Sequence, residues 1–386
     1  MKIVADENIP YVKEAFGGLG EVVTLPGRAL APQAVRDADI LLVRSVTPVN
    51  ARLLSGSRAG FVGTATIGTD HIDLDWLAER GIAFAAAPGS NANSVAEYIS
   101  AGLLVLSDRK GIGLRGSSIG VVGVGNVGSR VMRKARAMGM NVFMCDPPRA
   151  EDPADPERDS FISLEDLLSE KPDFITLHVP LERGGKYPTF HLADEPFFER
   201  FAEGCIFMNT SRGAVHDSPA LRQGIDKGQT GGVVLDVWEN EPGIDVALLR
   251  EVDLATPHIA GYSFDGKVRG VEMLYQAACA HLGVEPSWQP ELPPAQHAQL
   301  SINASRRGSE DVLREAVLTV YDIKADDARI RGLVDLDRHE IGPAFDRLRK
   351  EYPRRREFSN TEIQLTGGDK ETVSALQGLG FRVKEG

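Results

Sequence analysis

Three charged side chains follow three successive apolar segments in the second half of the chain. Arg212 lies in NTSRG, Glu241 in DVWENEP and His258 in TPHIAG. The planar fork of an arginine can hold a carboxylate through two parallel hydrogen bonds. A histidine takes up a proton near neutral pH, and a carboxylate beside it stabilises the imidazolium and fixes its tautomer. The set suits oxidation of a hydroxy acid, although each residue alone is more often a surface or structural residue.

A glycine-rich turn lies between two apolar runs in SSIGVVGVGNVGSRVMRKARAMGMNVFMCD. Gly123, Gly125 and Gly128 form the pattern GxGxxG, and Asp146 closes the second run. In a dinucleotide site the three glycines permit a tight turn, let the backbone approach a pyrophosphate and let the helix pack closely on the strand. Asp146 would bind the adenosine ribose and repel a 2′-phosphate, which predicts NAD as the cofactor. Arg149 weakens the preference for NAD over NADP.

Short apolar runs that alternate with helical stretches must position these residues. Such runs are typical of buried parallel strands, so we expect an α/β fold of two Rossmann-like, doubly wound domains. In open sheets of this kind, ligands bind beyond the carboxyl ends of the strands, where Arg212, Glu241 and His258 are expected. The expected strands of the first domain are 3–6, 21–25, 40–45, 61–65 and 82–87. In the second domain, residues 117–146 are expected to form a strand, the glycine turn, a helix and a second strand, and further strands are expected at 174–179, 205–210, 232–238 and 253–258.

The order of these patterns predicts three domains. A substrate (lid) domain would comprise residues 1–92 and 264–286, and an NAD-binding domain residues 93–263. A helix capped by Asn93 or Ser94 would link the two. After a proline-rich linker, residues 287–386 would form a small α+β domain, with strands at INAS, LTVYDI and IQLTG and a helix at IGPAFDRLRKEY.

The composition excludes several classes of function. The chain has 386 residues and a formal net charge of −12, which argues against nucleic-acid binding. No apolar run approaches the roughly 20 residues needed to span a membrane, so no membrane partner is expected. The cysteines are few and far apart, and no Cys/His cluster is present. We therefore expect no metal site, no disulfide and a cytoplasmic location.

Three further segments are less easily assigned. A basic run at 347–356 is interpreted as a solvated or subunit-facing helix. The segments 152–159 and 182–196 look like long loops, which either alter the rim of the cofactor site or are solvated insertions.

Several motifs resemble the NAD-dependent D-isomer-specific 2-hydroxyacid dehydrogenases. These are VVGVGNVG, HVPL, NTSRGAV, DVWENEP and TPHIAG, and the resemblance covers roughly residues 1–285. It implies two α/β domains with a cleft between them. It also implies that Arg212 and Glu241 are active-site residues and that His258 is the proton donor or acceptor.

The segments VADENIPY, GTATIGTDHID and FDRLRKEYPRRREFS narrow the resemblance to one branch of this family. Members of that branch oxidise a phosphorylated sugar acid in pyridoxal phosphate biosynthesis, and their tail forms a homodimer. The resemblance implies Ser45, Thr66 and Tyr262 as substrate contacts. The implied cofactor contacts, beyond the glycine turn, are Asn126, Val127, Asp146, Thr176, Thr210, Ser211, Asp236 and Gly261.

A phosphorylated substrate needs a cationic site. Arg44, at the end of a predicted strand, is our hypothesis for that site, and the tail arginines are a second candidate. The sequence leaves two other functions open: a related dehydrogenase acting on 3-phosphoglycerate or glycerate, and an NAD(H)-sensing binding protein. A purely structural homologue is disfavoured by the intact set of three charged residues.

Overall fold

The computed structural model describes all 386 residues, which form two compact units. Unit 1 comprises residues 1–92 and 262–293, and unit 2 comprises residues 93–261 and 294–386. In this division the C-terminal segment belongs to the same unit as the glycine-rich turn. The division into three domains stays a prediction.

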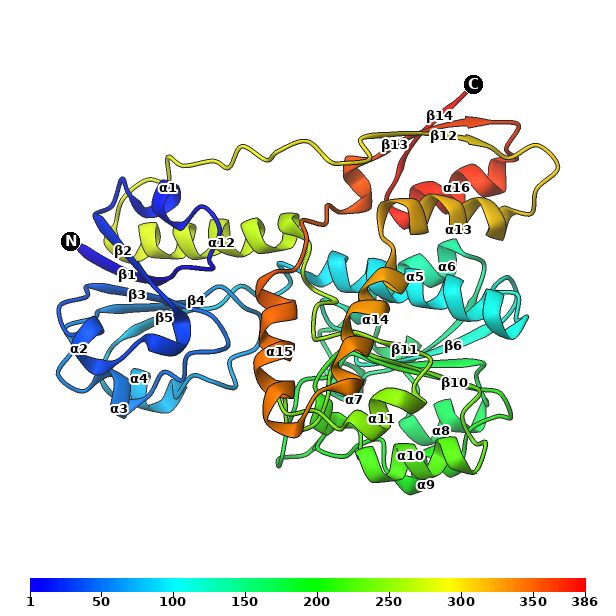
Figure 1. The fold of residues 1–386 in the computed structure, drawn as a ribbon, viewed down its shortest axis with the longest axis horizontal. Helices are drawn as coiled ribbons and strands as arrows, with labels where there is room; N and C mark the ends of the chain where they lie inside the picture. Colours follow the sequence, from blue (N-terminus) through cyan, green and yellow to red (C-terminus); the bar gives the residue numbers. More distant parts are fainter. The chain divides into compact units, whose positions relative to one another are not determined.

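Unit 1 is a parallel sheet with the strand order β2-β1-β3-β4-β5, covered by helices on both faces (Figure 1). Successive residues of a strand point to opposite faces. Ile3 and Ala5 therefore pack against α12, whereas Val4 packs in the core on the other face. The elements are β1 (Lys2–Asp6), α1 (Val12–Phe16), β2 (Glu21–Leu25), α2 (Pro32–Val35), β3 (Ile40–Val43), α3 (Ala51–Leu54), β4 (Phe61–Thr64), α4 (Leu74–Glu79), β5 (Ala83–Ala85) and α12 (Phe264–Leu282).

The carboxyl edge of this sheet carries the substrate residues predicted for unit 1. Val43 and Thr64 are paired in the register of β3 and β4, so the segments that follow the two strands leave the sheet side by side. Helix α12 begins close to this edge: the Ser263 hydroxyl accepts the Gly266 N–H and caps the helix, and Arg269 donates to the Ser90 carbonyl after β5.

Unit 2 contains a six-stranded parallel sheet with the order β11-β10-β9-β8-β6-β7. A single bridge between Met144 and Phe161 extends it beyond β7. The order reverses direction between β6 and β8, which is where doubly wound folds bind their ligands. The elements are α5 (Ala92–Lys110), β6 (Ser118–Val122), α6 (Gly128–Ala137), β7 (Asn141–Cys145), α7 (Pro147–Glu151), α8 (Leu164–Ser169), β8 (Phe174–Leu177), α9 (Glu195–Glu199), β9 (Ile206–Asn209), α10 (Ser218–Asp226), β10 (Gly232–Leu235), α11 (Val246–Glu251) and β11 (Leu254–Ala255).

The predicted cap of the linking helix is wrong. Helix α5 begins at Ala92, so Asn93 and Ser94 lie inside it. Their side chains donate to the two carboxylate oxygens of Glu357 at 2.9 and 3.0 Å. The tail of the chain therefore uses the polar groups that the sequence had suggested as a cap.

The C-terminal segment adds a second, three-stranded parallel sheet with the order β12-β13-β14. The predicted strand LTVYDI is wrong, because α13 and α14 occupy those residues. Val312, Leu313, Ala316 and Val317 are buried at helical spacing, and this longer pattern overrides the short β-branched run. The elements are β12 (Gln299–Asn303), α13 (Ser309–Val320), α14 (Ile323–Arg331), α15 (Arg338–Lys350), β13 (Glu362–Thr366), α16 (Lys370–Leu379) and β14 (Arg382–Glu385).

The C-terminal helices share the hydrophobic core of unit 2. Ile341 and Phe345 of α15 pack in one cluster with Trp238 from the segment after β10. The interpretation of the basic run as a solvated or subunit-facing helix is wrong for its last part, because Arg355 and Arg356 are only 6% and 8% exposed.

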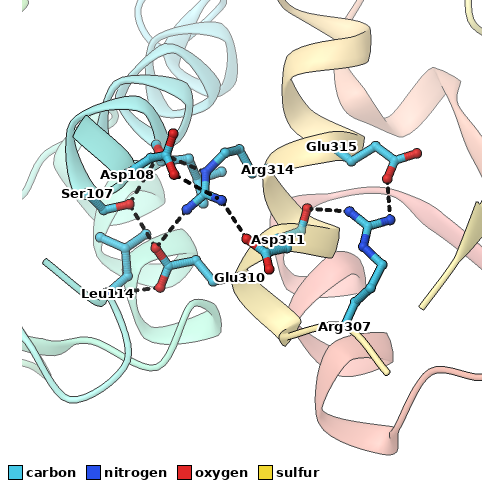
Figure 2. Close-up of polar contacts among 9 residues, drawn as sticks. Ser107, Asp108, Leu114, Arg307, Glu310, Asp311, Arg314 and Glu315 are labelled. Atoms are coloured by element: carbon cyan, nitrogen blue, oxygen red, sulfur yellow. Dashed lines mark hydrogen bonds and ion pairs between the residues drawn. The ribbon is translucent and has the colours of Figure 1, made fainter. Parts of the chain in front are cut away.

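Figure 2 shows how α13 is fastened to α5. One carboxylate oxygen of Glu310 accepts the Ser107 hydroxyl at 2.8 Å, and the other accepts the Leu114 N–H at 2.9 Å. Arg314 bridges Glu310 and Asp311 and donates to the Leu104 carbonyl. Glu310 therefore accepts hydrogen bonds from α5 and from Leu114, which follows it, while it also pairs with Arg314 of its own helix.

Two further features bear on the environment of the protein. No helix of the structure combines the length and the apolar character that crossing a membrane requires. Cys145, Cys205 and Cys279 are buried and none is in a disulfide.

Replacing Glu310 with alanine should lower the free energy of unfolding of unit 2 by about 1–3 kcal/mol, because the Leu114 N–H and Arg314 lose a half-buried acceptor. Urea unfolding followed by fluorescence measures the change. The control is Glu315→Ala, which removes an exposed carboxylate paired with Arg307 and should cost less than about 0.5 kcal/mol. Equal effects of the two variants would contradict the role assigned to Glu310.

Candidate active site

Glu241 and His258 form a hydrogen-bonded pair at the carboxyl edge of the large sheet. Glu241 Oε2 lies 2.7 Å from His258 Nδ1, and Glu241 Oε1 accepts the Trp238 N–H at 2.8 Å. Nδ1 is therefore the nitrogen that carries a proton when Glu241 is ionised. Nε2 of His258 makes no hydrogen bond within the chain, and the side chain is 32% exposed. The pair presents one basic nitrogen to a ligand.

The charge state of Glu241 supports this arrangement. Burial favours the neutral carboxyl, but His258, the Trp238 N–H and the Arg349 guanidinium outweigh it and lower the pKa of Glu241. An ionised Glu241 stabilises the imidazolium that forms when His258 takes up a proton.

His258 has a left-handed backbone, with φ at 57°. For a residue other than glycine this conformation costs on the order of 1–3 kcal/mol and persists only where the surroundings enforce it. Asp236 supplies the enforcement: its carbonyl accepts the His258 N–H at 2.7 Å, and its two carboxylate oxygens accept the N–H groups of Ile259 and Ala260 at 2.7 and 2.9 Å. Asp236 is 1% exposed. The predicted cofactor contact is thus bonded to the turn that carries His258.

Arg212 lies on a loop that touches the loop of Glu241. A Cβ on Gly213 would lie 2.0 Å from the backbone of Trp238, so only glycine lets the two segments approach this closely. Asn209, the last residue of β9, donates to the Arg212 carbonyl and accepts the Ser211 N–H, each at 2.9 Å. Arg212, Glu241 and His258 are therefore brought to neighbouring loops of one unit, as the sequence predicted.

The glycine-rich turn has the shape that a pyrophosphate requires. Gly123 has φ at 83°, and a Cβ there would lie 2.8 Å from the His178 carbonyl oxygen. Gly125 has open space where a Cβ would be, whereas a Cβ on Gly128 would clash with the Gly123 carbonyl oxygen at 2.0 Å. The N–H groups of Gly125 and Asn126 make no hydrogen bond within the chain, and α6 begins two residues after Asn126, at Gly128. These residues fit a dinucleotide phosphate at the start of the helix.

Asp146 and Arg149 together decide which dinucleotide suits this turn. Asp146 accepts the Val124 N–H at 2.8 Å, which holds its carboxylate at the rim. Arg149 forms ion pairs with Asp155 at 2.6 Å and with Glu157 at 2.9 Å. The loop at 152–159 therefore neutralises Arg149, a cation next to Asp146 that could otherwise attract a 2′-phosphate. The arrangement favours NAD.

Sequence reasoning missed His178, which lies directly after β8 opposite Gly123. Its Nε2 lies 3.0 Å from the Thr176 hydroxyl, and its Nδ1 lies 3.4 Å from the Thr210 hydroxyl. Burial of the ring lowers the pKa of His178 to about 3, so it is neutral. His178 links two predicted cofactor contacts, and its place in HVPL at a strand end was the signal that could have revealed it.

The segment 182–196 is fastened to the loop before Glu241. His191 Nε2 lies 2.8 Å from Glu239 Oε1, and the Ser218 N–H donates to Glu239 Oε2 at 2.9 Å. Through the contact of His191 with Glu239, the segment therefore helps to hold the loop that carries Glu241.

The predicted substrate residues of unit 1 lie at the carboxyl edge of its sheet. Arg44 Nη2 donates to the Tyr262 hydroxyl at 3.2 Å, and the Lys267 ammonium lies 4.1 Å from the centre of the Tyr262 ring. The Thr66 hydroxyl lies 2.7 Å from that of Thr64. Ser45 is exposed. The structure thus adds Lys267 to the predicted group.

Two of the tail arginines, Arg355 and Arg356, are already used within unit 2. Arg355 Nη2 donates to the carbonyls of Ser94 and Ala260, and Arg356 donates to Asn360. Both side chains are buried within unit 2. The remaining predicted contacts in unit 2, Val127, Ser211 and Gly261, lie respectively at the start of α6, after β9 and next to the His258 turn.

Two family models match the chain. Residues 83–260 match the model described as "D-isomer specific 2-hydroxyacid dehydrogenase, NAD binding domain". Residues 292–380 match a "Domain of unknown function (DUF3410)". The first match covers the glycine-rich turn and the three charged residues Arg212, Glu241 and His258.

Curated relatives and solved structures agree with this match. The erythronate-4-phosphate dehydrogenase of Edwardsiella ictaluri is 47% identical, over 99% of both chains, and that of Cellvibrio japonicus is also 47% identical, over 99% of this chain and all of the relative. The D-lactate dehydrogenase of Aquifex aeolicus, solved with NAD and lactic acid, is 25% identical with a TM-score of 0.60, over 73% of this chain and 96% of that chain.

The geometry predicts a specific defect for His258→Asn. Loss of the base should reduce single-turnover formation of NADH by about 10²–10⁴-fold. Binding of NADH, measured by fluorescence titration, should stay within about twofold, because the glycine turn is untouched. His281→Asn, which alters an exposed histidine of α12, serves as the control. Wild-type turnover in His258→Asn would contradict the assignment.

Freeing Arg149 should shift cofactor preference. In the double variant Asp155→Asn/Glu157→Gln the guanidinium loses its acidic partners and can meet a 2′-phosphate. A charge-assisted hydrogen bond then raises the ratio of kcat/KM for NADP to that for NAD by about tenfold or more. Asp159→Asn, whose carboxylate lies near Arg158 and is 96% exposed, should leave the ratio unchanged. An unchanged ratio in the double variant would show that Arg149 does not affect the choice.

Proposed function

This chain belongs to the erythronate-4-phosphate dehydrogenases within the D-isomer specific 2-hydroxyacid dehydrogenase family, and we propose that its substrate is 4-phospho-D-erythronate. The product would be (R)-3-hydroxy-2-oxo-4-phosphooxybutanoate, an intermediate of pyridoxal phosphate biosynthesis. The chain is an NAD-dependent oxidoreductase. The observation that carries the proposed chemistry is the Glu241–His258 hydrogen bond, which leaves Nε2 of His258 open as a base.

The proposed mechanism assigns one task to each residue of the set. Arg212 binds the substrate carboxylate and orients C2. His258 Nε2 removes the proton of the C2 hydroxyl, and Glu241 stabilises the resulting imidazolium. Bound NAD supplies the acceptor for the hydride that leaves C2. The turn Gly125–Asn126 and the start of α6 hold the dinucleotide phosphates.

We propose that Arg44 and Lys267 bind the substrate phosphate. Arg44 is half-buried, and its one polar contact is with the neutral Tyr262 hydroxyl, so its charge has no carboxylate partner within the chain. Lys267 approaches the same tyrosine from the first turn of α12. Arg44 and Lys267 are two positive charges beside the same tyrosine, and the N-terminal end of α12 adds a partial positive charge nearby. This arrangement suits a doubly charged phosphate.

Two further expectations complete the proposal. The C-terminal segment would form a homodimer, as the tail motifs predicted. A cytoplasmic location would suit the three buried, unpaired cysteines.

Replacing Arg44 or Lys267 with methionine should raise KM for 4-phospho-D-erythronate by about 10–100-fold, since each removes a charge-assisted contact to phosphate. KM for unphosphorylated D-erythronate should change little. Arg52→Met, which removes an exposed arginine of α3, is the control. An equal rise of KM for both acids would contradict the phosphate site, because the loss would then concern the common part of the substrate.

A further inference from the structure

The C-terminal segment reaches the catalytic loop of its own chain through one buried arginine. Arg355 lies between α15 and β13 and is 6% exposed. Its Nη2 donates to the Ala260 carbonyl at 2.8 Å and to the Ser94 carbonyl at 3.0 Å. Its guanidinium carbon lies 4.1 Å from the centre of the Tyr321 ring.

The contact with Ala260 completes the restraint on His258. Asp236 holds the N–H groups of His258, Ile259 and Ala260. Arg355 holds the carbonyl at the far end of the same turn. A residue other than glycine keeps a left-handed conformation only where the surrounding structure over-determines it. Asp236 secures one side from the sheet, and Arg355 secures the other from the tail.

Arg355 is itself fixed by the way its segment joins α5. The Phe358 N–H donates to Glu97 Oε1 at 2.8 Å. Glu357 accepts hydrogen bonds from Asn93 and Ser94. These contacts place residues 355–358 against the first two turns of α5, so the planar fork of Arg355 joins α5 to the His258 turn.

A second contact links the tail to the other member of the pair. Gly342 of α15 lies against Pro242, so that a Cβ on Gly342 would be 3.5 Å from the Pro242 ring. Burial raises the pKa of Glu241, and the net lowering comes from His258, then the Trp238 N–H and last the Arg349 guanidinium of the same helix. The tail therefore acts on both Glu241 and His258.

We propose that Arg355 is a positioning residue for His258, and that the C-terminal segment, which matches a domain of unknown function, sets the geometry of the active site within its own chain. This inference rests on the proposed role of His258 as the base. It does not depend on which 2-hydroxy acid is oxidised or on the oligomeric state.

The test compares two arginines of the tail that both donate to backbone carbonyls of unit 2, although Arg331 also pairs with Asp327. Arg331 also donates to backbone carbonyls of unit 2, those of Leu249 and Val252, but away from the catalytic turn. Arg355→Met should slow single-turnover NADH formation by about 10–100-fold, the effect of a small misplacement of a reacting group. Arg331→Met should leave that rate unchanged. Arg355→Lys, which keeps the charge and one donor, should give an intermediate rate.

A second readout reports on His258 without turnover. In protein labelled with ¹⁵N-histidine, the Nδ1 proton held by Glu241 should give a downfield signal that is absent in His258→Asn. Arg355→Met should shift or broaden this signal, and Arg331→Met should not. NADH affinity should stay within about twofold in both, since neither arginine touches the glycine turn.

The outcomes separate this inference from the proposed function. Equal slowing in Arg355→Met and Arg331→Met, in proportion to lost thermal stability, would overturn it, as would an unchanged rate and signal in Arg355→Met. If Arg355→Met does not fold, the comparison of Arg355→Lys with wild type decides in the same way. If the wild type oxidises a different 2-hydroxy acid, the proposed substrate fails while the Arg355 comparison is made with that acid. If the wild type oxidises no 2-hydroxy acid, the NMR signal of His258 alone tests whether Arg355 positions that residue.

Discussion

The hydrogen bond between Glu241 and His258 is the interaction that the surroundings of the candidate active site are arranged to hold. His258 makes it from a left-handed backbone, a conformation that persists only where the surrounding structure enforces it. The buried carboxylate of Asp236 and the guanidinium of Arg355 restrain the turn from opposite sides. Contacts from the sheet and from the C-terminal segment therefore together fix the position of the His258 ring.

Charge is distributed locally, in ways that the net charge of −12 does not reveal. Arg149, near the cofactor turn, is neutralised by two carboxylates, whereas Arg44, near the proposed substrate site, has no acidic partner. An arginine whose charge is already neutralised, such as Arg149, is a poor binding site for a phosphate, whereas one without an acidic partner, such as Arg44, suits that role. Whether an arginine can bind an anionic ligand therefore depends on the residues that surround it in the fold, and these come from distant parts of the sequence.

The periodic and local features of the protein were predictable from sequence. The α/β fold class, the family, NAD and the enzyme class are confirmed, because apolar runs, the GxGxxG turn and the strand-end motifs are short-range signals. Errors arose where distant contacts decide. Asn93 and Ser94 donate hydrogen bonds to Glu357 and do not cap the helix. The segment LTVYDI continues the helical pattern of the residues before it, and Arg355 is buried although it lies in a basic run. His178 was missed because one of its partners, Thr210, follows the neighbouring strand β9, and Asn209 was missed because it holds the loop that follows its own strand.

The central claim is that this chain oxidises a phosphorylated 2-hydroxy acid with His258 as base. Its most direct test is single-turnover NADH formation by the wild-type protein mixed with NAD and 4-phospho-D-erythronate, with 3-phosphoglycerate and D-glycerate in parallel. The account predicts a burst of NADH with 4-phospho-D-erythronate alone. A burst only with another acid would contradict the substrate while keeping the family. Binding of NADH without a burst from any acid would contradict catalysis and favour an NAD(H)-sensing protein.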